Sequence, residues 1–236
     1  MVNYEPLRFY ITPEHKCSYL PHKRSATLFA DPNRSLSRAE YSRLSQLGFR
    51  RSGSNLYRPH CKDCSACIPL RIPAKLFKYR RRHKRILNIN KRVVTTKTDP
   101  YFSEEVFDLY SRYIEYRHKK GEMYPPNASQ FTDFLVNGRK EASFYEFKEG
   151  KELLGISVAD DLEDGMSAVY TFFNPELKSR ALGIFAILWL IQQTRKTCKD
   201  FLYLGYWIEA NKKMNYKSQF TPFEKYLDKA WILTEK

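Results

Sequence analysis

Four cysteines have the number and spacing of a metal site. Three stand at three-residue intervals in YRPHCKDCSACIPLR and one lies upstream in HKCSYLP: they are Cys61, Cys64, Cys67 and Cys17. Four thiolates can hold zinc tetrahedrally, and C-x2-C-x2-C followed closely by proline, here Pro69, also suits an iron–sulfur cluster. His60 is the alternative fourth ligand. The other interpretation is that the thiols are unliganded in a small core, as we expect for Cys198.

Positive charge is concentrated in the first part of the chain. The 236 residues have 41 Lys and Arg against 26 Asp and Glu, a net charge of +15, but residues 1–98 have a balance of +17 and residues 99–236 one of −2. The stretch 75–92, KLFKYRRRHKRILNINKR, has nine basic residues and no acid. This favours a polyanion partner, with phosphate contacts from this stretch and stacking on Phe77 and Tyr79. A solvated strand and linker is the alternative.

A third feature is the turn PELKSRALG, which precedes a strongly apolar segment. Small and basic residues at the start of a helix present free backbone N–H groups and charge to phosphate or carboxylate, and Ser179 and Arg180 are the candidates. Many helices begin in this way, so the turn alone indicates an anion site only weakly.

Neither a membrane span nor secretion is indicated by the composition. Apolar runs fall short of the roughly 18–20 residues that a membrane helix needs. The start MVNYEPLRFYITPEHK has proline and acids but no apolar core, so it does not read as a signal peptide. We therefore expect a cytoplasmic protein without disulfides, and no membrane partner.

The elements that would position these residues fall into two groups, and we predict an N-terminal domain at residues 1–98 and a second at 99–236. In the first, Ser37 and Glu40 form the capping box of a helix that ends at Gly48, and a hairpin turns at Gly53.

In the second group, a helix begins after a Ser103 cap and ends before Gly121. Strands follow, broken by turns around Gly150 and at Asp164-Gly165. A buried helix over ALGIFAILWLIQQTRKTC and a buried strand, FLYLGYW, complete the pattern. This order predicts an α+β fold with a mixed layer of acyltransferase type.

Several long motifs carry a family resemblance. They are CSYLP, GFRRSGSNLYRPHCKDCSACIPLR, YRHKKGEM, SAVYTFFNP, SRALGIFAILWLI and FLYLGYWIEANKKMNYKSQFTPFE. Together, over about residues 15–225, the chain resembles the bacterial aminoacyl-tRNA–protein transferases, more narrowly their aspartate/glutamate leucyltransferase branch. The resemblance implies a small cysteine-bearing N-terminal domain and a C-terminal GNAT-like acyltransferase domain. Family members move an aminoacyl group from charged tRNA to the α-amine of a protein's first residue, which marks that protein for degradation.

The resemblance gives the candidate residues their roles. An acceptor that begins with Asp or Glu needs a cationic pocket, and the candidates around the RRSG turn are Arg50, Arg51, Ser52 and Arg58. Contact with tRNA phosphate or solvent is the alternative for these arginines. The charged tRNA end would meet Lys213 and Lys217. Since SRALG lacks the full glycine pattern of a coenzyme A turn, we expect no coenzyme A.

Transfer to an amine is aminolysis of an ester, so the nucleophile belongs to the substrate. The proton acceptor could be His118 or Asp160, and donors to the oxyanion or ester could be Tyr170 or Tyr206. Alternatively, His118 caps its helix and the tyrosines lie in the core with satisfied hydroxyls.

Three functions are compatible with the sequence. The first is transfer of leucine from leucyl-tRNA to proteins with N-terminal Asp or Glu, with arginine as the alternative donated residue. The second is a non-enzymatic RNA-binding protein with a metal-knuckle domain, which leaves the second half of the chain without a role. The third is an acetyltransferase that uses coenzyme A, for which the turn is a poor match.

Overall fold

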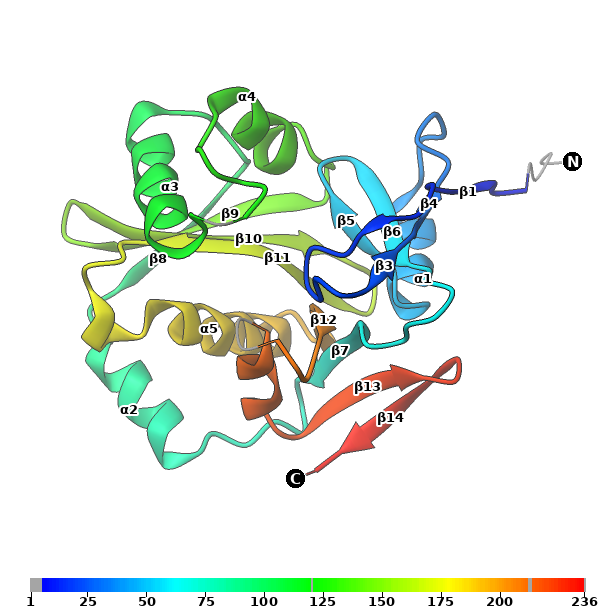
Figure 1. Ribbon diagram of the computed structural model, residues 1–236. Helices are drawn as coiled ribbons and strands as arrows, with labels where there is room; N and C mark the ends of the chain where they lie inside the picture. The colour runs from blue at the N-terminus through cyan, green and yellow to red at the C-terminus, as the bar shows by residue number, and fades with distance from the viewer. Residues whose placement is uncertain (1–5, 120, 212–213, 236) are drawn as a thin grey trace, which may run out of the picture.

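Most strands of the chain join a single large sheet, seen edge-on through the middle of Figure 1. The computed structural model describes residues 6–119, 121–211 and 214–235, and within them the eight-stranded sheet has the order β14-β13-β7-β12-β11-β10-β9-β8. Its strands are β7 (Ile68–Pro73), β8 (Val94–Thr98), β9 (Ala142–Glu149), β10 (Glu152–Asp161), β11 (Gly165–Phe173), β12 (Phe201–Trp207), β13 (Phe223–Leu227) and β14 (Ala230–Thr234). The strand pattern and the turns predicted between residues 142 and 174 are confirmed.

The sheet takes strands from both halves of the sequence. Strand β7 pairs antiparallel with β12 and with β13, and β8 pairs antiparallel with β9. Strands β11 and β12 form a parallel pair, joined by a helical crossover. The division at residues 98 and 99 stays a prediction, and the fold places two strands from before it in the same sheet as those from after it.

Helices cover both faces of this sheet (Figure 1). On one face lie α5 (Leu182–Lys196) and α2 (Arg81–Ile89); on the other lie α3 (Glu104–Arg117), α4 (Ala128–Phe131) and a π-helical turn, η1 (Thr132–Val136). The hydroxyl of Ser103 accepts the N–H of Val106 at 3.3 Å, which confirms the predicted start of α3. None of the helices in the described part of the chain is long and apolar enough to span a membrane.

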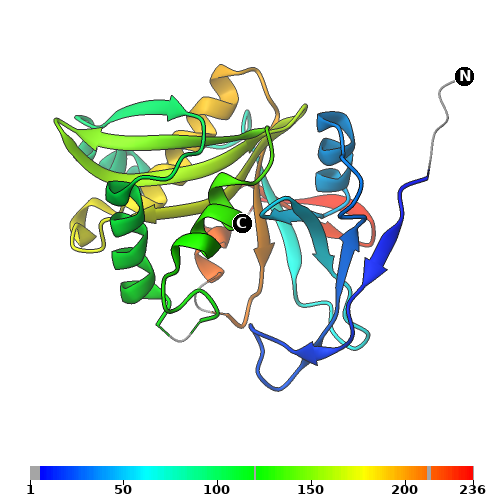
Figure 2. The same ribbon diagram turned by 90° about the horizontal axis from the view of Figure 1, so that it is seen from above.

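A smaller layer packs against one end of the sheet, as the view from above shows (Figure 2). It contains a four-stranded sheet of order β1-β4-β6-β5, the short pair β2-β3 and helix α1. These elements are β1 (Phe9–Ile11), β2 (His15–Lys16), β3 (Arg24–Ser25), β4 (Thr27–Ala30), α1 (Arg38–Gln46), β5 (Arg50–Ser52) and β6 (Asn55–Pro59). The capping box of Ser37 and Glu40 is confirmed. Gly48 and Gly53 both have positive φ, 82° and 59°, at the predicted end of the helix and at the predicted hairpin turn. The fold is therefore a mixed α+β structure.

Two expectations for local structure are wrong. The strand-and-linker alternative for residues 75–92 fails because Arg81–Ile89 is helical, with His83, Ile86 and Leu87 turned inward at helical spacing. Cys198 is exposed, with φ of 57°, because it follows the last turn of α5.

Candidate active site

Strands β11 and β12 separate soon after they meet. Their parallel pairing covers only Gly165–Ser167 against Phe201–Tyr203. Beyond it, β12 shifts register against β7 at Gly205, whose φ is +72°. The separation leaves backbone groups of β11 without a strand partner, and a buried backbone carbonyl must find another donor.

Arg50 of β5 fills this opening. Its Nη2 donates to the carbonyl oxygens of Ala168 and Val169 at 2.6 and 2.7 Å, on the part of β11 that β12 has left. A Cβ at residue 205 would stand 1.9 Å from Nη1 of Arg50, so a larger residue there would displace the guanidinium. Nη1 is buried and has no hydrogen-bond partner among the residues that the structure describes. One arm of the guanidinium is thus held by the backbone of β11, and the other is buried beside Gly205 without a partner in the described residues.

A buried lysine lies close to Arg50 at this opening. Lys217, on the 3-10 helix η3 (Asn215–Gln219), is 8% exposed, and its Nζ donates to the carbonyl oxygen of Tyr206 at 2.5 Å. Burial, and then the charge of Arg50, lowers the pKa of Lys217 well below its usual range. Burial raises the pKa of the neighbouring Tyr216, and the charges of Arg50 and Arg117 partly offset that rise. The surroundings of Arg50 and Lys217 would therefore favour an anion.

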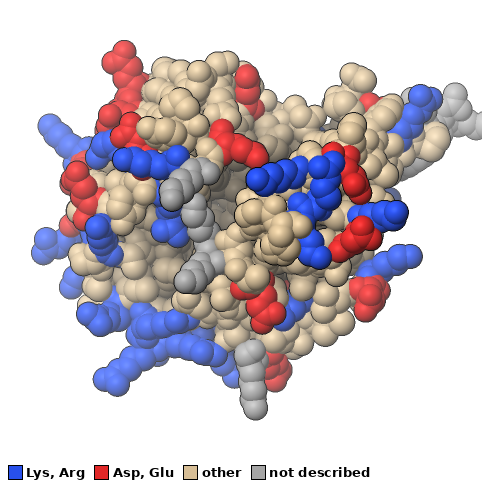
Figure 3. All heavy atoms as spheres, in the orientation of Figure 1, with Lys and Arg blue, Asp and Glu red and all other residues tan. Residues whose placement is uncertain are grey.

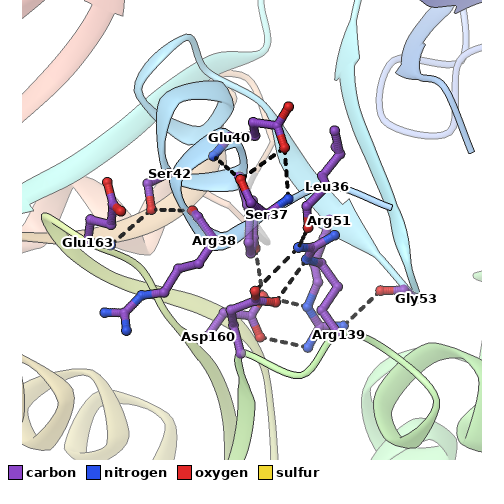
Figure 4. A network of polar contacts seen from close by, with 12 residues as sticks. Leu36, Ser37, Arg38, Glu40, Ser42, Arg51, Gly53, Arg139, Asp160 and Glu163 are labelled. Atoms are coloured by element: carbon purple, nitrogen blue, oxygen red, sulfur yellow. Dashed lines mark hydrogen bonds and ion pairs between the residues drawn. The ribbon is translucent and has the colours of Figure 1, made fainter. Parts of the chain in front are cut away.

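Arg51, the next residue of β5, points into the protein instead (Figure 4). Its Nε and Nη2 donate to the two carboxylate oxygens of Asp160 at 2.5 and 2.8 Å, and the hydroxyl of Tyr41 donates to the same carboxylate at 2.6 Å. Both side chains of the ion pair are 0% exposed. This burial argues against direct contact of Arg51 or Asp160 with a substrate.

The other predicted catalytic residues lie on different elements around the opening. His118 is the C-cap of α3, and its ring lies 5.7 Å from that of Tyr113, which in turn lies 6.2 Å from Tyr170 of β11. The hydroxyl of Tyr170 contacts the sulfur of Met123 at 3.6 Å. Burial raises the pKa of Tyr170 well above its usual range, so the phenol stays protonated and can donate.

Tyr206 lies on β12 with its hydroxyl turned to the N-terminal layer. The hydroxyl oxygen is 3.0 Å from the carbonyl oxygen of Gly48 and 3.1 Å from that of Tyr57. Burial raises its pKa well above the usual range. This is the core position with a satisfied hydroxyl that the sequence left open as an alternative.

The remaining predicted substrate contacts are not gathered at the opening. Arg58 donates to the carbonyl of Leu47 at 3.3 Å and lies over the Phe49 ring, and Ser52 is exposed in its hairpin. In the 3-10 helix η2 (Lys178–Arg180), Ser179 is exposed. Arg180 is bound to Asn90 at 3.0 Å and to Glu149 at 2.6 Å. Lys213 lies outside the described residues.

The four predicted metal ligands are free, half-buried thiols in two loops of the N-terminal layer. Burial, followed by negative charge at Cys17, Cys61 and Cys64, raises the pKa of Cys67 to about 12. Cys67 also lines a cavity of about 150 Å³ with His60, Arg58 and Tyr206. Four thiols are a suitable donor set for zinc or an iron–sulfur cluster, but in the described residues no group of three or more Cys, His, Asp or Glu side chains has the arrangement to hold a metal ion. The metal site stays a prediction.

One signal of the opening is present in the sequence. Gly205 stands inside the apolar strand FLYLGYW, and a glycine in a strand interior often marks a bulge or a close approach by another group. The sequence does not show that the approaching group is Arg50, because Arg50 lies 155 positions before Gly205.

The comparisons with known proteins cover both halves of the chain. Residues 15–85 match the family described as Arginine-tRNA-protein transferase, N terminus, and residues 105–227 match Arginine-tRNA-protein transferase, C terminus. The aspartate/glutamate leucyltransferase of Pseudomonas fluorescens Pf-5 is 49% identical over 227 residues, which is 96% of this chain and 97% of that protein. That of Pseudomonas savastanoi pv. phaseolicola is 49% identical over 226 residues, or 96% of each chain.

Among solved structures, L-PGS from Bacillus licheniformis aligns with a TM-score of 0.43 and 13% sequence identity. The alignment covers 62% of this chain and 47% of that chain, and the similarity is too low to indicate a shared fold or function. The family matches span more than half of the residues, and the relatives extend over nearly the whole length. The chain therefore belongs to the arginine-tRNA-protein transferase family.

Proposed function

We propose that this chain transfers leucine from leucyl-tRNA to the α-amine of proteins that begin with Asp or Glu. The names of its relatives support the reaction and favour leucine over arginine as the donated residue. The observation that carries the acceptor choice is the opening between β11 and β12, where a buried guanidinium nitrogen of Arg50 lacks a partner. Because charged tRNA is the donor, we place the protein in the cytoplasm, where charged tRNA is made and used.

We further propose that the second half of the chain is a GNAT-like acyltransferase core. The support is the succession of antiparallel β9, β10 and β11 followed by the parallel unit β11–α5–β12. Strands that part after three paired residues leave an edge that no strand covers, and an extended acyl or peptide segment would lie along it beside Arg50. The same opening would admit the aminoacyl ester and the acceptor's first residue.

The reaction needs no nucleophile from the protein. The neutral α-amine attacks the ester carbonyl carbon, and the carbon–nitrogen bond forms as the carbon–oxygen bond to the tRNA ribose breaks. The amine gives up a proton and the ribose oxygen gains one, so no co-reactant is required. Since an α-amine has a pKa of about 7.7–8.0, a substantial fraction is already neutral near pH 7.5.

We assign the acceptor's side-chain carboxylate to Nη1 of Arg50, with Lys217 beside it. A carboxylate there would pair with the unsatisfied nitrogen and favour the charged form of the lysine, whereas an uncharged first residue would leave the buried Nη1 of Arg50 without a partner. Tyr170 is the candidate donor to the oxyanion and His118 the candidate proton acceptor, since both lie on the α3 side of the opening. Arg51 and Asp160 are positioning residues, because their buried pair fixes β5 with Arg50 turned to the opening.

A transfer assay tests this function. Purified protein is mixed with radiolabelled leucyl-tRNA or arginyl-tRNA and peptides that begin with Asp, Glu or Ala. We expect label from leucyl-tRNA on the Asp and Glu peptides alone. Transfer only from arginyl-tRNA would overturn the choice of donor. Tight tRNA binding without transfer would favour a non-enzymatic RNA-binding protein, and acetyl transfer from coenzyme A would replace the proposal with an acetyltransferase.

A further inference from the structure

Helix α2 presents a basic face to solvent. Its inner side carries His83, 1% exposed and stacked on Phe77 and Phe220 at centroid distances of 5.4 and 5.9 Å. The outer side carries basic residues at helical spacing, all exposed: Arg81, Lys84 and Arg85. Basic side chains gather at the lower left of Figure 3, where Figure 1 places α2. The packing of His83 on aromatic rings thus holds the inner side of α2 in place, and the outer side presents positive charge to solvent.

These three cations have no internal counter-charge. The side chains of Arg81, Lys84 and Arg85 make no hydrogen bond or ion pair with any residue in the part of the chain that the structure describes. Other basic residues nearby are engaged, since Arg80 donates to the Thr221 hydroxyl and Lys75 pairs with Asp200. Three unpaired positive charges on a rigid helix repel one another, and an external polyanion relieves that repulsion.

The ends of α2 touch both segments that leave the opening. Nη2 of Arg82 donates to the carbonyl oxygen of Gln219 at 2.9 Å, at the end of η3, which follows β12. At the other end, Nδ2 of Asn90 donates to the carbonyl oxygen of Arg180 at 2.8 Å, in η2, which follows β11. A ligand that enters between β11 and β12 therefore has α2 as a neighbouring surface.

We infer that the outer face of α2 binds phosphates of the tRNA acceptor stem. The inference rests on the proposed function: the ester at the 3′ end must reach the opening, so the stem next to that end lies over the adjacent surface. Side chains can read an RNA helix only through its phosphates, shape and minor groove, which suits exposed arginines on a helix. An anionic membrane is less suitable, because an interfacial helix inserts its apolar side, and here that side is packed on the core.

The test compares two double variants that each remove two positive charges. Arg81→Gln with Arg85→Gln changes the outer face of α2; Arg43→Gln with Lys140→Gln changes exposed residues of α1 and of the loop before β9. Binding of uncharged tRNA and of a minihelix RNA that contains only the acceptor stem is measured between 50 and 200 mM salt. We expect the α2 variant to lose about one unit of the slope of log affinity against log salt per arginine, and roughly tenfold or more in affinity, for both RNAs. The control should keep the wild-type slope.

Three results would overturn the inference. They are an unchanged slope in the α2 variant, a loss for whole tRNA with none for the minihelix, and a loss of binding to phosphatidylglycerol vesicles with RNA binding intact. Thermal unfolding checks that the variants fold, which glutamine on an exposed helix face should permit.

Kinetics separate this inference from the proposed function. If both hold, the α2 variant raises KM for leucyl-tRNA and leaves kcat and the peptide KM unchanged. A chain that transfers no leucine, but loses minihelix affinity in the α2 variant, would sink the proposed function and leave the α2 surface in place.

Discussion

Two neighbouring arginines of β5 have opposite environments because successive side chains of a strand point to opposite faces. Arg51 is buried against Asp160, and Arg50 lies in the opening between β11 and β12. The sequence predicted a carboxylate partner for both. For Arg51 the partner is Asp160 of the same chain. It lies 109 positions away in the sequence, too far for a local sequence pattern to indicate the pair.

The first prediction concerns Arg50. In Arg50→Lys the charge stays, but the amine cannot hold two backbone carbonyls and still present a second nitrogen to a ligand. We expect kcat/KM for peptides beginning with Asp or Glu to fall roughly 30-fold or more, since a lost buried charge-assisted contact is worth 2 kcal/mol or more. Steady-state kinetics with varied peptide measures this. Arg58→Lys is the control, and an unchanged peptide KM in Arg50→Lys would contradict the assignment.

At the scale of elements, the shape of β12 depends on a glycine. Gly205→Ala would place a methyl group 1.9 Å from Nη1 of Arg50 and strain a φ of +72°. We expect a loss of about 2–4 kcal/mol in the free energy of unfolding, and reduced transfer because Arg50 is displaced. Urea unfolding and the peptide assay measure the two effects.

Gly150 is the matched control for that change. Its φ is +60°, but a Cβ there meets nothing within 4 Å. Gly150→Ala therefore carries the backbone strain without the collision, about 1–2 kcal/mol, and should leave transfer intact. Equal effects of the two substitutions would mean that Arg50 is not held against β12.

The anchoring of α2 has a pH signature. Burial, and then the charges of Arg82 and Arg80, lowers the pKa of His83 from 6.5 to about 4. The unfolded chain takes up a proton at this residue below pH 6.5 and the folded chain only below about 4, so acidification through this window favours unfolding. In His83→Phe, which keeps the ring stack, this component disappears. We therefore expect the free energy of unfolding of His83→Phe, relative to that of the wild type, to rise by about 2–3 kcal/mol between pH 7 and pH 4. Urea unfolding of both proteins at the two pH values measures this difference. A constant difference would mean that His83 titrates normally.

Local sequence signals predicted the helix caps and turns well, but they did not predict which elements pack against one another. The Ser37 capping box, the Ser103 cap and the turn at Gly150 are each complete within a few residues, and the structure has them. Helix α2 was obscured because its basic outer face dominates the composition, although His83, Ile86 and Leu87 keep a helical spacing. Gly205 marks an irregularity in β12, but the opening itself arises where β11 and β12 fail to pair, which no single strand encodes.

At the scale of the whole molecule, one buried ion pair ties the N-terminal layer to the large sheet. Arg51 belongs to β5 and Asp160 to β10, and neither is exposed. Asp160→Asn leaves the guanidinium without its counter-charge, so we expect a loss of about 3–5 kcal/mol in the free energy of unfolding. Replacing both partners by apolar residues should be milder than that single change.

The same variant decides between positioning and catalysis. If Asp160 only positions Arg50, the folded fraction of Asp160→Asn keeps the shape of the wild-type pH–rate profile. Loss of kcat at saturating substrates, with the acidic limb of the profile gone, would instead identify Asp160 as the proton acceptor.

A further whole-molecule prediction concerns the cysteines. If a metal closes the loops that contain them, elemental analysis of anaerobically purified protein finds zinc or iron, and Cys61→Ser or Cys64→Ser releases it and lowers the melting temperature. Cys198→Ser is the control, since that thiol is exposed and follows α5. Wild-type protein free of both metals would end the metal hypothesis.

The place of β7 in the sheet also bears on how the chain is made. Residues 68–73 pair with β12 and β13, so on a growing chain they wait for residues 201–227 to leave the ribosome. Until then a nascent apolar segment with open edges is exposed, the kind of segment that chaperones hold and that aggregates when synthesis outpaces folding. The centre of the sheet is thus completed only after residues 201–227 have been made, and folding of this protein depends on sequence-distant pairing that forms slowly.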